Sequence, residues 1–293
     1  MDSLNSVLRQ TCRDFEVIVV DDNSSDGTGD LVSSLDDGRI RLISHETNLG
    51  AGAARNTGIR AATGDFIAFH DSDDEWLPTK LDKQLAELNR RGADWIGIYS
   101  GLLIVRDVVH REGARLQLRY IPDVRLTHLQ GDIFHSLIED SFVSTQTLLV
   151  RRHALLAVGE FDETLPALED WDYTLRLAQL GKLAFIDEPL VLQRFSPDSI
   201  TRSERRRVEA RVSIFEKNRP AIADFPALLC HHCFEIAGGY RIVGEYDKSI
   251  IFLWKCMQLQ PLHIRYWMTA VYTYMLKIKT AIMNNVAKDS DKV

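Results

Sequence analysis

The sequence is poor in cysteine and has no long apolar run. Its four cysteines, at positions 12, 230, 233 and 256, show no spacing typical of a secreted disulfide framework, so we expect a reducing compartment. No stretch of 18 uncharged apolar residues occurs, and the N-terminus lacks the charged flank and apolar core of a signal peptide. These absences exclude a disulfide scaffold and a membrane span from the interpretation, and they predict a cytoplasmic protein.

Positive charge is also in short supply. Lysine and arginine number 35 against 42 aspartates and glutamates, which gives a net charge of −7. A broad nucleic-acid interface needs a basic surface, so we expect no nucleic-acid partner. Apolar residues make up 45% of the 293 residues, enough for one large domain with an appendage.

Short apolar runs alternate with helical patterns along the first two thirds of the chain. Runs rich in β-branched residues predict buried strands, and a mostly parallel α/β sheet follows from their alternation with helices. From about residue 204 the pattern is helical, which predicts domains at 1–203 and 204–293. The strands are expected at 15–20, 40–44, 65–69, 95–105 and 144–150, and the helices at 48–62, 77–88 and 169–181.

Acidic residues follow two of the expected strands. Asp21 and Asp22 end the first, while FIAFHDSDDEW (66–76) places Asp71 and Asp73 after the third. Ligands of open α/β sheets bind beyond the carboxyl ends of the strands. If the chain stays extended, the carboxylates of Asp71 and Asp73 face one side, and Mg²⁺ or Mn²⁺ would relieve their repulsion. The alternative is a solvated acidic turn that caps the helix near Pro78.

Three motifs occur in order: VIVVDDNSSDGT, NLGAGAARNTGIRAATGDFIAFHDSDDEWLP and EDWDYTLRLAQLG. Together they resemble glycosyltransferase family 2, the inverting enzymes of the Rossmann-like GT-A fold, over about residues 4–200. The resemblance implies a nucleotide-diphospho-sugar transferase of hexosyltransferase type with a UDP-sugar donor. The acceptor would be a saccharide or lipid-linked hydroxyl, in cell-surface polysaccharide or lipopolysaccharide biosynthesis.

The resemblance also implies roles for individual residues. A departing diphosphate needs a metal to neutralise its charge, and the acceptor hydroxyl needs a base. For the paired acids at 169 and 170, helix capping is the alternative, and one carboxylate can do both jobs. Trp171 either lines the acceptor pocket or belongs to the core. The implied assignments are nucleotide-sugar binding by Asp21, Asp22, Arg55 and Asp71, Mn²⁺ or Mg²⁺ binding by Asp73 and Asp71, and general base Asp170 with Glu169 beside it.

Two positions depart from the family pattern. Met1 falls within a helix, DSLNSVLRQT (2–11), that a strand normally precedes. The sequence then either starts at an internal methionine, which we favour, or derives from a degraded gene. Ser196 stands where relatives often carry a histidine that reaches the metal, so a ligand is expected to be missing there. We interpret His70 as a packing or hydrogen-bonding residue at a strand end, outside the metal site.

The C-terminal region carries weaker signals. Residues 235–261 resemble one tetratricopeptide unit with Gly244 between its helices, and Cys230 with Cys233 is expected in a helix core. The aromatic-rich stretch 262–283 predicts either a last packed helix or peripheral contact with the inner face of the cell membrane. The alternative function for the whole chain is a non-catalytic nucleotide-sugar-binding remnant that acts through this helical tail.

Overall fold

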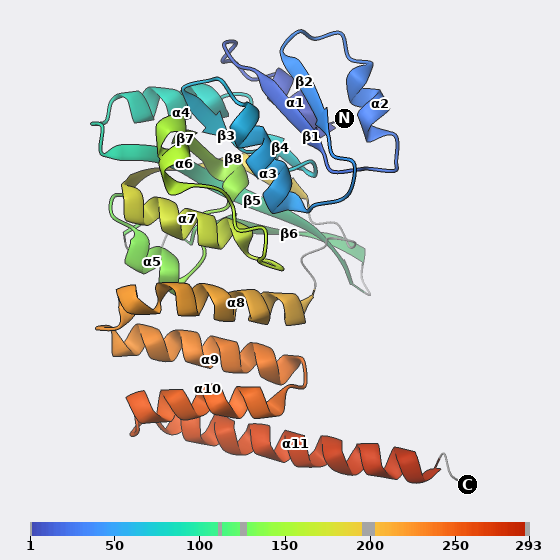
Figure 1. Cartoon of the computed structure of the whole chain (residues 1–293), viewed down its shortest axis with the longest axis vertical. Helices are drawn as coiled ribbons and strands as arrows, with labels where there is room; N and C mark the ends of the chain where they lie inside the picture. The colour runs from blue at the N-terminus through green and yellow to red at the C-terminus, as the bar shows by residue number, and fades with distance from the viewer. Residues whose placement is uncertain (1, 111–112, 124–127, 195–202, 291–293) are drawn as a thin grey trace. The chain divides into compact units, whose positions relative to one another are not determined.

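The structure, a computed structural model, describes residues 2–110, 113–123, 128–194 and 203–290. The chain divides into two compact units, the first formed by residues 1–164 with 169–199 and the second by 165–168 with 200–293. The domain boundary predicted after residue 203 stays a prediction, since residues 195–202 lie outside the described ranges. Figure 1 labels the elements of both units.

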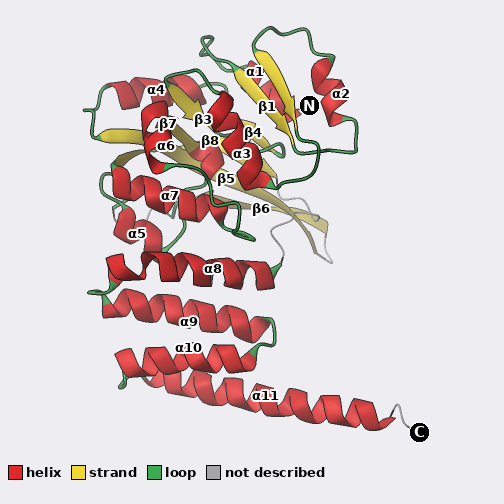
Figure 2. Cartoon of the chain, viewed as in Figure 1, coloured by secondary structure: helices red, strands yellow, loops and turns green. Residues whose placement is uncertain are grey.

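The first unit mixes helices and strands (Figure 2). The expected strands and helices recur with shifts of a few residues, except that 145–147 form a 3₁₀ turn before a shorter strand. Its elements are α1 (Asp2–Leu8), β1 (Val17–Asp21), α2 (Thr28–Ser33), β2 (Ile40–Ser44), α3 (Ala51–Ala61), β3 (Phe66–Ala68), β4 (Asp74–Trp76), α4 (Lys80–Asn89), β5 (Trp95–His110), β6 (Gly113–Ile121), α5 (Phe134–Glu139), β7 (Leu148–Arg151), α6 (Arg152–Val158), α7 (Glu169–Leu180) and β8 (Lys182–Arg194).

The described strands form two sheets. β1 and β2 pair in parallel, and a six-stranded sheet has the order β3-β7-β5-β8-β4 with β6 on β5. The α/β class is confirmed, but parallel order does not extend to the larger sheet, in which β5–β8 is parallel and the other described pairings are antiparallel. For β5 and β6 the reason is their connection: β5 ends at His110 and β6 begins at Gly113, and so short a connection produces an antiparallel pair. The alternation of strands and helices did not reveal the order of the other strands.

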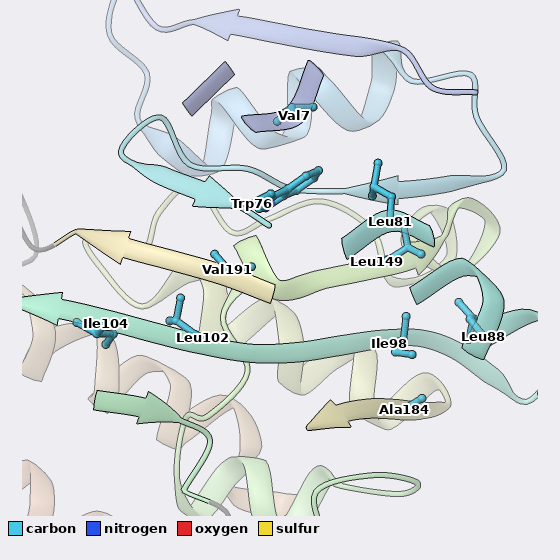
Figure 3. Packing of buried hydrophobic residues seen from close by; sticks show 10 residues of the cluster. All are labelled: Val7, Trp76, Leu81, Leu88, Ile98, Leu102, Ile104, Leu149, Ala184 and Val191. Carbon is cyan, nitrogen blue, oxygen red and sulfur yellow. The ribbon is translucent and has the colours of Figure 1, made fainter. Parts of the chain in front are cut away.

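An apolar core forms on one side of the larger sheet (Figure 3). The long strand β5 contributes Ile98, Leu102 and Ile104, and α4 contributes Leu81 and Leu88. Each of these side chains is at most 7% exposed. Trp76 of β4 lies in the same cluster, directly after the acidic stretch, so the core fixes the chain at the point where the acidic residues end.

The second unit is helical in its described residues. Its helices are α8 (Glu204–Asn218), α9 (Pro226–Ile242), α10 (Tyr246–Leu259) and α11 (Ile264–Ser290), and Figure 1 shows consecutive helices lying side by side. Gly244 separates α9 from α10 with φ +79°, a left-handed conformation that favours glycine. Two helices thus lie on either side of Gly244, and the likeness of this pair to a tetratricopeptide unit stays a prediction.

Small and sulfur-containing side chains fill the contact between α9 and α10. Cys230, Cys233 and Cys256 are buried, as expected for core cysteines. Ser249 is also buried and donates its hydroxyl to the Ala237 carbonyl at 2.7 Å, which explains how a polar residue replaces an apolar one there. Within the described residues, none of the helices is both long and apolar enough to cross a bilayer.

Candidate active site

The first acidic group lies at the end of β1. Asp21 is buried, and one of its carboxylate oxygens accepts the backbone N–H of Ser24 at 3.1 Å. Gly29, in the first turn of α2, comes so close that a Cβ there would lie 3.0 Å from the other oxygen. Any larger residue at position 29 would press on the carboxylate. The sequence from β1 to α2 thus keeps Asp21 in one place.

Asp22 organises the entry into α3. One of its oxygens accepts the Leu49 N–H at 2.8 Å, and the other accepts the Gly50 N–H at 2.7 Å. The ring of His45 lies 2.7 Å from Asp22 and its other nitrogen lies 3.0 Å from the Thr57 hydroxyl. Burial disfavours the charged carboxylate, but the bonds from Leu49, His45 and Gly50 outweigh it and hold the pKa of Asp22 below its usual value.

Arg55 joins three separate parts of the first unit. Its guanidinium, on α3, donates to Asp71 Oδ1 and to Glu169 Oε1, each at 2.9 Å. The side chain is only 15% exposed and lies over the Phe161 ring. Because Asp71 follows β3 and Glu169 begins α7, one cation brings together motifs that are far apart in the sequence.

The charges around Arg55 change the protonation of their neighbours. Burial opposes its charge, but Asp71, Glu169 and Asp170 together raise the pKa of Arg55 above its usual value. Burial and the neighbouring Glu169 raise the pKa of Asp170 to about 6, while Arg55 acts in the opposite direction. Asp170 is therefore ionised near neutral pH yet basic enough to take a proton from a bound hydroxyl.

The acidic stretch after β3 is a turn. The Asp74 N–H donates to the Asp71 carbonyl at 3.1 Å, so the chain is not extended over 71–73. The expectation that Asp71 and Asp73 face one side through strand alternation fails, because that argument required an extended chain. Asp73 is exposed at the tip of the turn, and the Asp71 side chain is 30% exposed.

Asp74, which the sequence analysis did not single out, is fully buried beside these two acids. Neither of its oxygens has a hydrogen-bond partner within the described residues. Burial, followed by the charges of Asp71 and Asp73, raises the pKa of Asp74 to about 8. Gln146 and Gln193 act in the opposite direction but do not outweigh burial and the neighbouring charges. Positive charge near this turn would ease the ionisation of Asp74.

The chemistry of this turn fits a divalent cation. Mg²⁺ and Mn²⁺ are held by hard oxygen ligands, commonly one or two carboxylates with phosphates and waters in the other positions. Asp71 and Asp73 can supply that number. No group of three or more metal-ligating side chains gathers within the described ranges, so a cation here would depend on oxygen atoms from its ligand as well.

Asn56, next to Arg55, has a positioning function that the sequence analysis missed. It is fully buried, accepts the Phe161 N–H at 2.7 Å and donates to the Phe161 carbonyl at 3.1 Å and to Glu163 at 2.8 Å. The loop at 161–163 is thereby fixed to α3. A polar amide within a run of small helical residues was the available signal, since such a side chain needs partners when buried.

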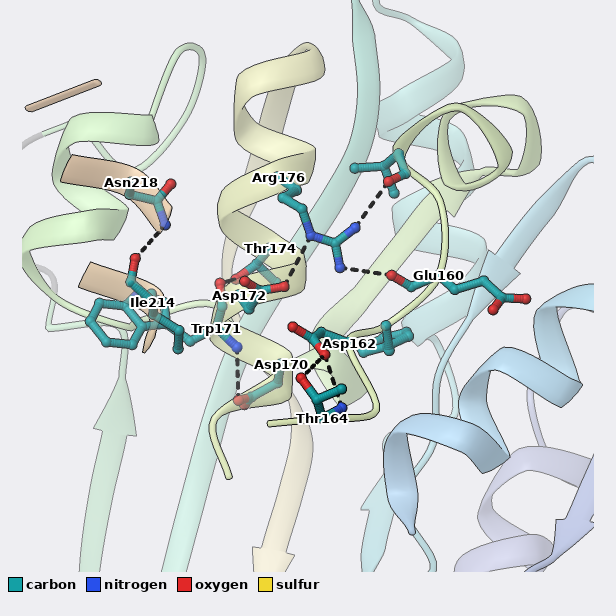
Figure 4. Close-up of polar contacts among 12 residues, drawn as sticks. Glu160, Asp162, Thr164, Asp170, Trp171, Asp172, Thr174, Arg176, Ile214 and Asn218 are labelled. Carbon is teal, nitrogen blue, oxygen red and sulfur yellow. Dashed lines mark hydrogen bonds and ion pairs between the residues drawn. The ribbon is translucent and has the colours of Figure 1, made fainter. Parts of the chain in front are cut away.

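The first turn of α7 is fixed by side chains drawn in Figure 4. Asp172 accepts the Arg176 Nε at 3.0 Å, and the same guanidinium donates to the carbonyls of Val158 and Glu160. Trp171 is 1% exposed and donates its indole N–H to the Leu137 carbonyl at 2.8 Å. Of the two alternatives for Trp171, the structure supports the core.

Capping also occurs at this helix. The Asp170 carboxylate accepts the backbone N–H of Trp171 at 2.8 Å, as the capping alternative required. Its second oxygen is not used in that bond. Capping and proton transfer are therefore compatible for Asp170.

Two further positions from the sequence analysis are His70, which the structure describes, and Ser196, which it does not. His70 lies 2.8 Å from the Ser3 hydroxyl and packs edge-on against Trp76, and burial lowers its pKa to about 4. The interpretation of His70 as a packing residue is confirmed. Ser196 lies outside the described residues.

Comparison with known proteins finds a family match for the segment that carries the first two of the three motifs. Residues 2–133 match the family model described as Glycosyl transferase family 2. The chain is 48% identical over 84 residues, 29% of its length, to the UDP-Glc:alpha-D-GlcNAc-diphosphoundecaprenol beta-1,3-glucosyltransferase WfgD of Escherichia coli. It is 32% identical over 196 residues, 64% of its length, to the amylovoran biosynthesis glycosyltransferase AmsB of Erwinia amylovora. These matches cover 33% and 62% of the two relatives.

Solved structures confirm the GT-A fold. S. aureus TarS 1-349 superimposes with a TM-score of 0.64 at 22% identity, over 89% of this chain and 76% of that one. The mannosyltransferase PcManGT from Pyrobaculum calidifontis, in complex with GDP-Man and Mn²⁺, gives 0.54 at 18% identity, over 96% and 81%. At these identities the likeness concerns the fold alone.

Proposed function

From the match of residues 2–133 to the glycosyl transferase family 2 model, we propose that the chain transfers a sugar from a nucleotide-diphosphate donor to a hydroxyl acceptor. The transfer would invert the configuration at the anomeric carbon. UDP is the proposed nucleotide, because the relative WfgD is named for UDP-Glc. The acceptor class we propose is a saccharide or lipid-linked saccharide in surface-polysaccharide assembly. WfgD is named for a diphosphoundecaprenol acceptor, and AmsB for amylovoran biosynthesis.

Asp170 is the proposed general base. In a single displacement, its carboxylate removes the proton of the attacking hydroxyl while the oxygen bonds to the anomeric carbon from the face opposite the departing diphosphate. The pKa of about 6 supports this role, since the carboxylate is ionised at neutral pH and still accepts a proton in the transition state. The bond to the Trp171 N–H fixes the orientation of the side chain.

Arg55 and Glu169 are proposed as positioning residues for both sides of the reaction. Arg55 bonds Asp71 on the donor side and Glu169 beside the base, so the position of each depends on the same guanidinium. The buried positive charge also keeps the pKa of Asp170 lower than burial and Glu169 alone would set it.

A bound Mn²⁺ or Mg²⁺, held by Asp73 and Asp71, would supply positive charge to the diphosphate leaving group. The proposed nucleotide-contacting residues are Asp21, Asp22, Arg55 and Asp71. We place the reaction at the inner face of the cell membrane, because a lipid-linked acceptor would lie there.

The observation that carries this proposal is the Arg55 bridge between Asp71 and Glu169, which unites the acidic turn with the base-bearing helix. The test measures UDP release from UDP-sugars by the full chain with Mn²⁺, with Mg²⁺ and with EDTA. We expect release with metal and none with EDTA, and Asp73→Ala should abolish the metal-dependent part. Release that is unaffected by EDTA in both proteins would contradict the metal assignment.

The alternative function, a nucleotide-sugar-binding remnant, separates from catalysis in the same experiment. A remnant would bind UDP in a calorimeter yet release none from any donor. A screen over UDP- and GDP-sugars with a mixture of saccharide acceptors therefore distinguishes the two, and it identifies the donor at the same time.

A further inference from the structure

The helix α11 turns its apolar side away from its neighbour. The buried or half-buried side of α11 is mixed in character. Tyr266 and Leu276 are apolar, whereas Thr273 is fully buried, Lys277 forms an ion pair with Asp247, and the Thr280 hydroxyl lies 3.4 Å from that of Tyr246. A helix at the surface of a protein normally packs its apolar stripe inward. In α11 most of the large apolar side chains lie on the exposed side instead.

The outward face is continuous and large. At 100° per residue its apolar side chains cover about half of the helix circumference. A shallow groove of about 300 Å³ lies among Met275, Ile278, Ile282 and Met283. The exposed side chains, between 43% and 97% accessible, are Leu262, Ile264, Trp267, Met268, Val271, Tyr272, Tyr274, Met275, Ile278, Ile282 and Met283. A contiguous apolar surface of this kind marks an interaction site.

Charge distinguishes this region from the rest of the chain. Residues 200–293 contain 15 lysines and arginines against 9 aspartates and glutamates, a net charge of +6, whereas residues 1–199 contain 20 against 33, a net charge of −13. Within 262–283 there is no acidic residue, while Arg265 and Lys279 are exposed on α11. The partner of this face should therefore be both apolar and anionic.

A second copy of the chain fits these charges poorly. The spacing of Ile264, Met268, Val271, Met275, Ile278 and Ile282 is that of a coiled-coil seam. In a coiled coil, however, the positions beside the seam commonly carry charges of both signs. Here one flank has Arg265, Tyr272 and Lys279, and the other has Trp267, Tyr274 and Ala281. In neither orientation of two such helices would Arg265 or Lys279 find an acidic partner beside the seam.

We propose that the outward face of α11 lies on an anionic lipid bilayer, with its apolar side chains in the boundary between headgroups and acyl chains. Trp267, Tyr272 and Tyr274 suit that boundary because their rings are apolar with a polar edge. Arg265 and Lys279 meet the anionic headgroups, where each basic residue adds to binding. The inference depends on burial and charge in the second unit, so it does not require that sugar transfer occurs.

The test is co-sedimentation of the full chain with vesicles of phosphatidylcholine alone or mixed with phosphatidylglycerol. We expect binding to the mixed vesicles that weakens as salt rises. Met275→Glu together with Ile278→Glu should lower the partition coefficient more than about tenfold, and Lys279→Gln about fivefold. Leu156→Glu is the matched control, since Leu156 is on helix α6 and 55% exposed, close to the 56% of Met275. It should bind like the unaltered chain.

Three results would overturn the proposal. One is absence of binding to anionic vesicles at low salt, and another is equal loss for the α11 variant and the Leu156 control. The third is a dimer in sedimentation velocity that the α11 variant disperses while no lipid binding occurs, which would assign the face to a second copy. Far-UV circular dichroism and UDP release in the absence of vesicles check that each variant is folded, and they keep this result separate from the proposed activity.

Discussion

The candidate active site of the first unit and the helix α11 of the second differ in which side chains they bury and which they expose. In the first, charged groups turn inward and are paired: Arg55, with a 15% exposed side chain, lies between Asp71 and Glu169. In the second, α11 turns large apolar groups outward, such as Met268 at 66% and Val271 at 60% exposure. Each arrangement is costly in isolation, because buried charge loses hydration and exposed apolar surface orders water.

The comparison teaches where function can be sought without a bound ligand. We expect a buried charge cluster or an exposed apolar face to have a binding partner that offsets its unfavourable free energy. For the first unit that is a charged substrate and cation, and for the second an apolar, anionic surface. The two units therefore make separate predictions, and their effects should differ in size and in kind.

The largest effect is expected at Asp170. Asp170→Asn keeps the bond to the Trp171 N–H but cannot accept a proton, so kcat should fall about 10²–10⁴-fold with donor binding nearly unchanged. Steady-state kinetics with calorimetric donor titration measure both quantities. Asp172→Asn is a control for a carboxylate one turn into the same helix, which binds Arg176. Unaltered turnover in the Asp170 variant would remove the base from the proposal.

A somewhat smaller effect is expected at Arg55. Arg55→Gln leaves Asp71 and Glu169 without their cation, and the free energy of unfolding should fall toward the lower end of about 3–5 kcal/mol, since both carboxylates retain contact with water. Loss of the positive charge also raises the pKa of Asp170. The acid limb of the kcat profile, expected near pH 6, should therefore move to higher pH.

Arg55→Lys separates charge from geometry at this position. A lysine keeps the positive charge but lacks the planar fork that bonds two carboxylates at once. The acid limb should stay near its original pH while the rate falls. Equal pH profiles in the glutamine and lysine variants would contradict an electrostatic role for Arg55.

The sequence predicted which residues form the site better than it predicted the contacts between them. The motifs placed Arg55 within a helix, Asp71 beyond a strand, and Glu169 with Asp170 at a helix start. These four residues do come together. That one arginine would bridge two acids could not be predicted, because helix periodicity does not show where an element far away in the sequence will pack.

Other features followed from contacts that have no local pattern. Asp74 reads as one more member of an acidic turn, yet it is fully buried. The hydrogen bonds of Asp22 to Leu49 and Gly50 depend on the parallel pairing of β1 with β2. By contrast, the helical pattern of the C-terminal region was readable, but which face of α11 would point outward was not, since both sides carry aromatic or apolar residues.

A moderate effect, confined to stability, is expected at Lys80. This lysine is fully buried against the Trp76 ring, donates to Gln84 at 2.9 Å, and burial lowers its pKa to about 7. Between pH 7 and the usual lysine pKa, the unfolded chain binds more protons than the folded one, so stability rises with pH in this window. Lys80→Met should remove about 1–2 kcal/mol of that rise between pH 7 and pH 9.

Urea unfolding at the two pH values measures the difference. Lys83→Met in the same helix is the control, because the Lys83 side chain is 41% exposed and pairs with Glu188 at the surface. Other titrating groups contribute equally to all three proteins and cancel in the comparison. The same pH dependence in the Lys80 variant and the unaltered chain would mean that Lys80 keeps its usual pKa in the folded state.

The smallest effect is expected on α11, where the contrast between the units becomes sharpest. Met275→Gln should change the free energy of unfolding by no more than about 0.5 kcal/mol, because a 56% exposed side chain loses little burial. Leu253→Ala, at a fully buried position of α10, should cost about 2–5 kcal/mol. Thermal unfolding of both variants in the absence of lipid makes the comparison. If Met275→Gln cost as much as Leu253→Ala, the outward face would be part of the fold's own packing, and its apolar residues would need no external partner.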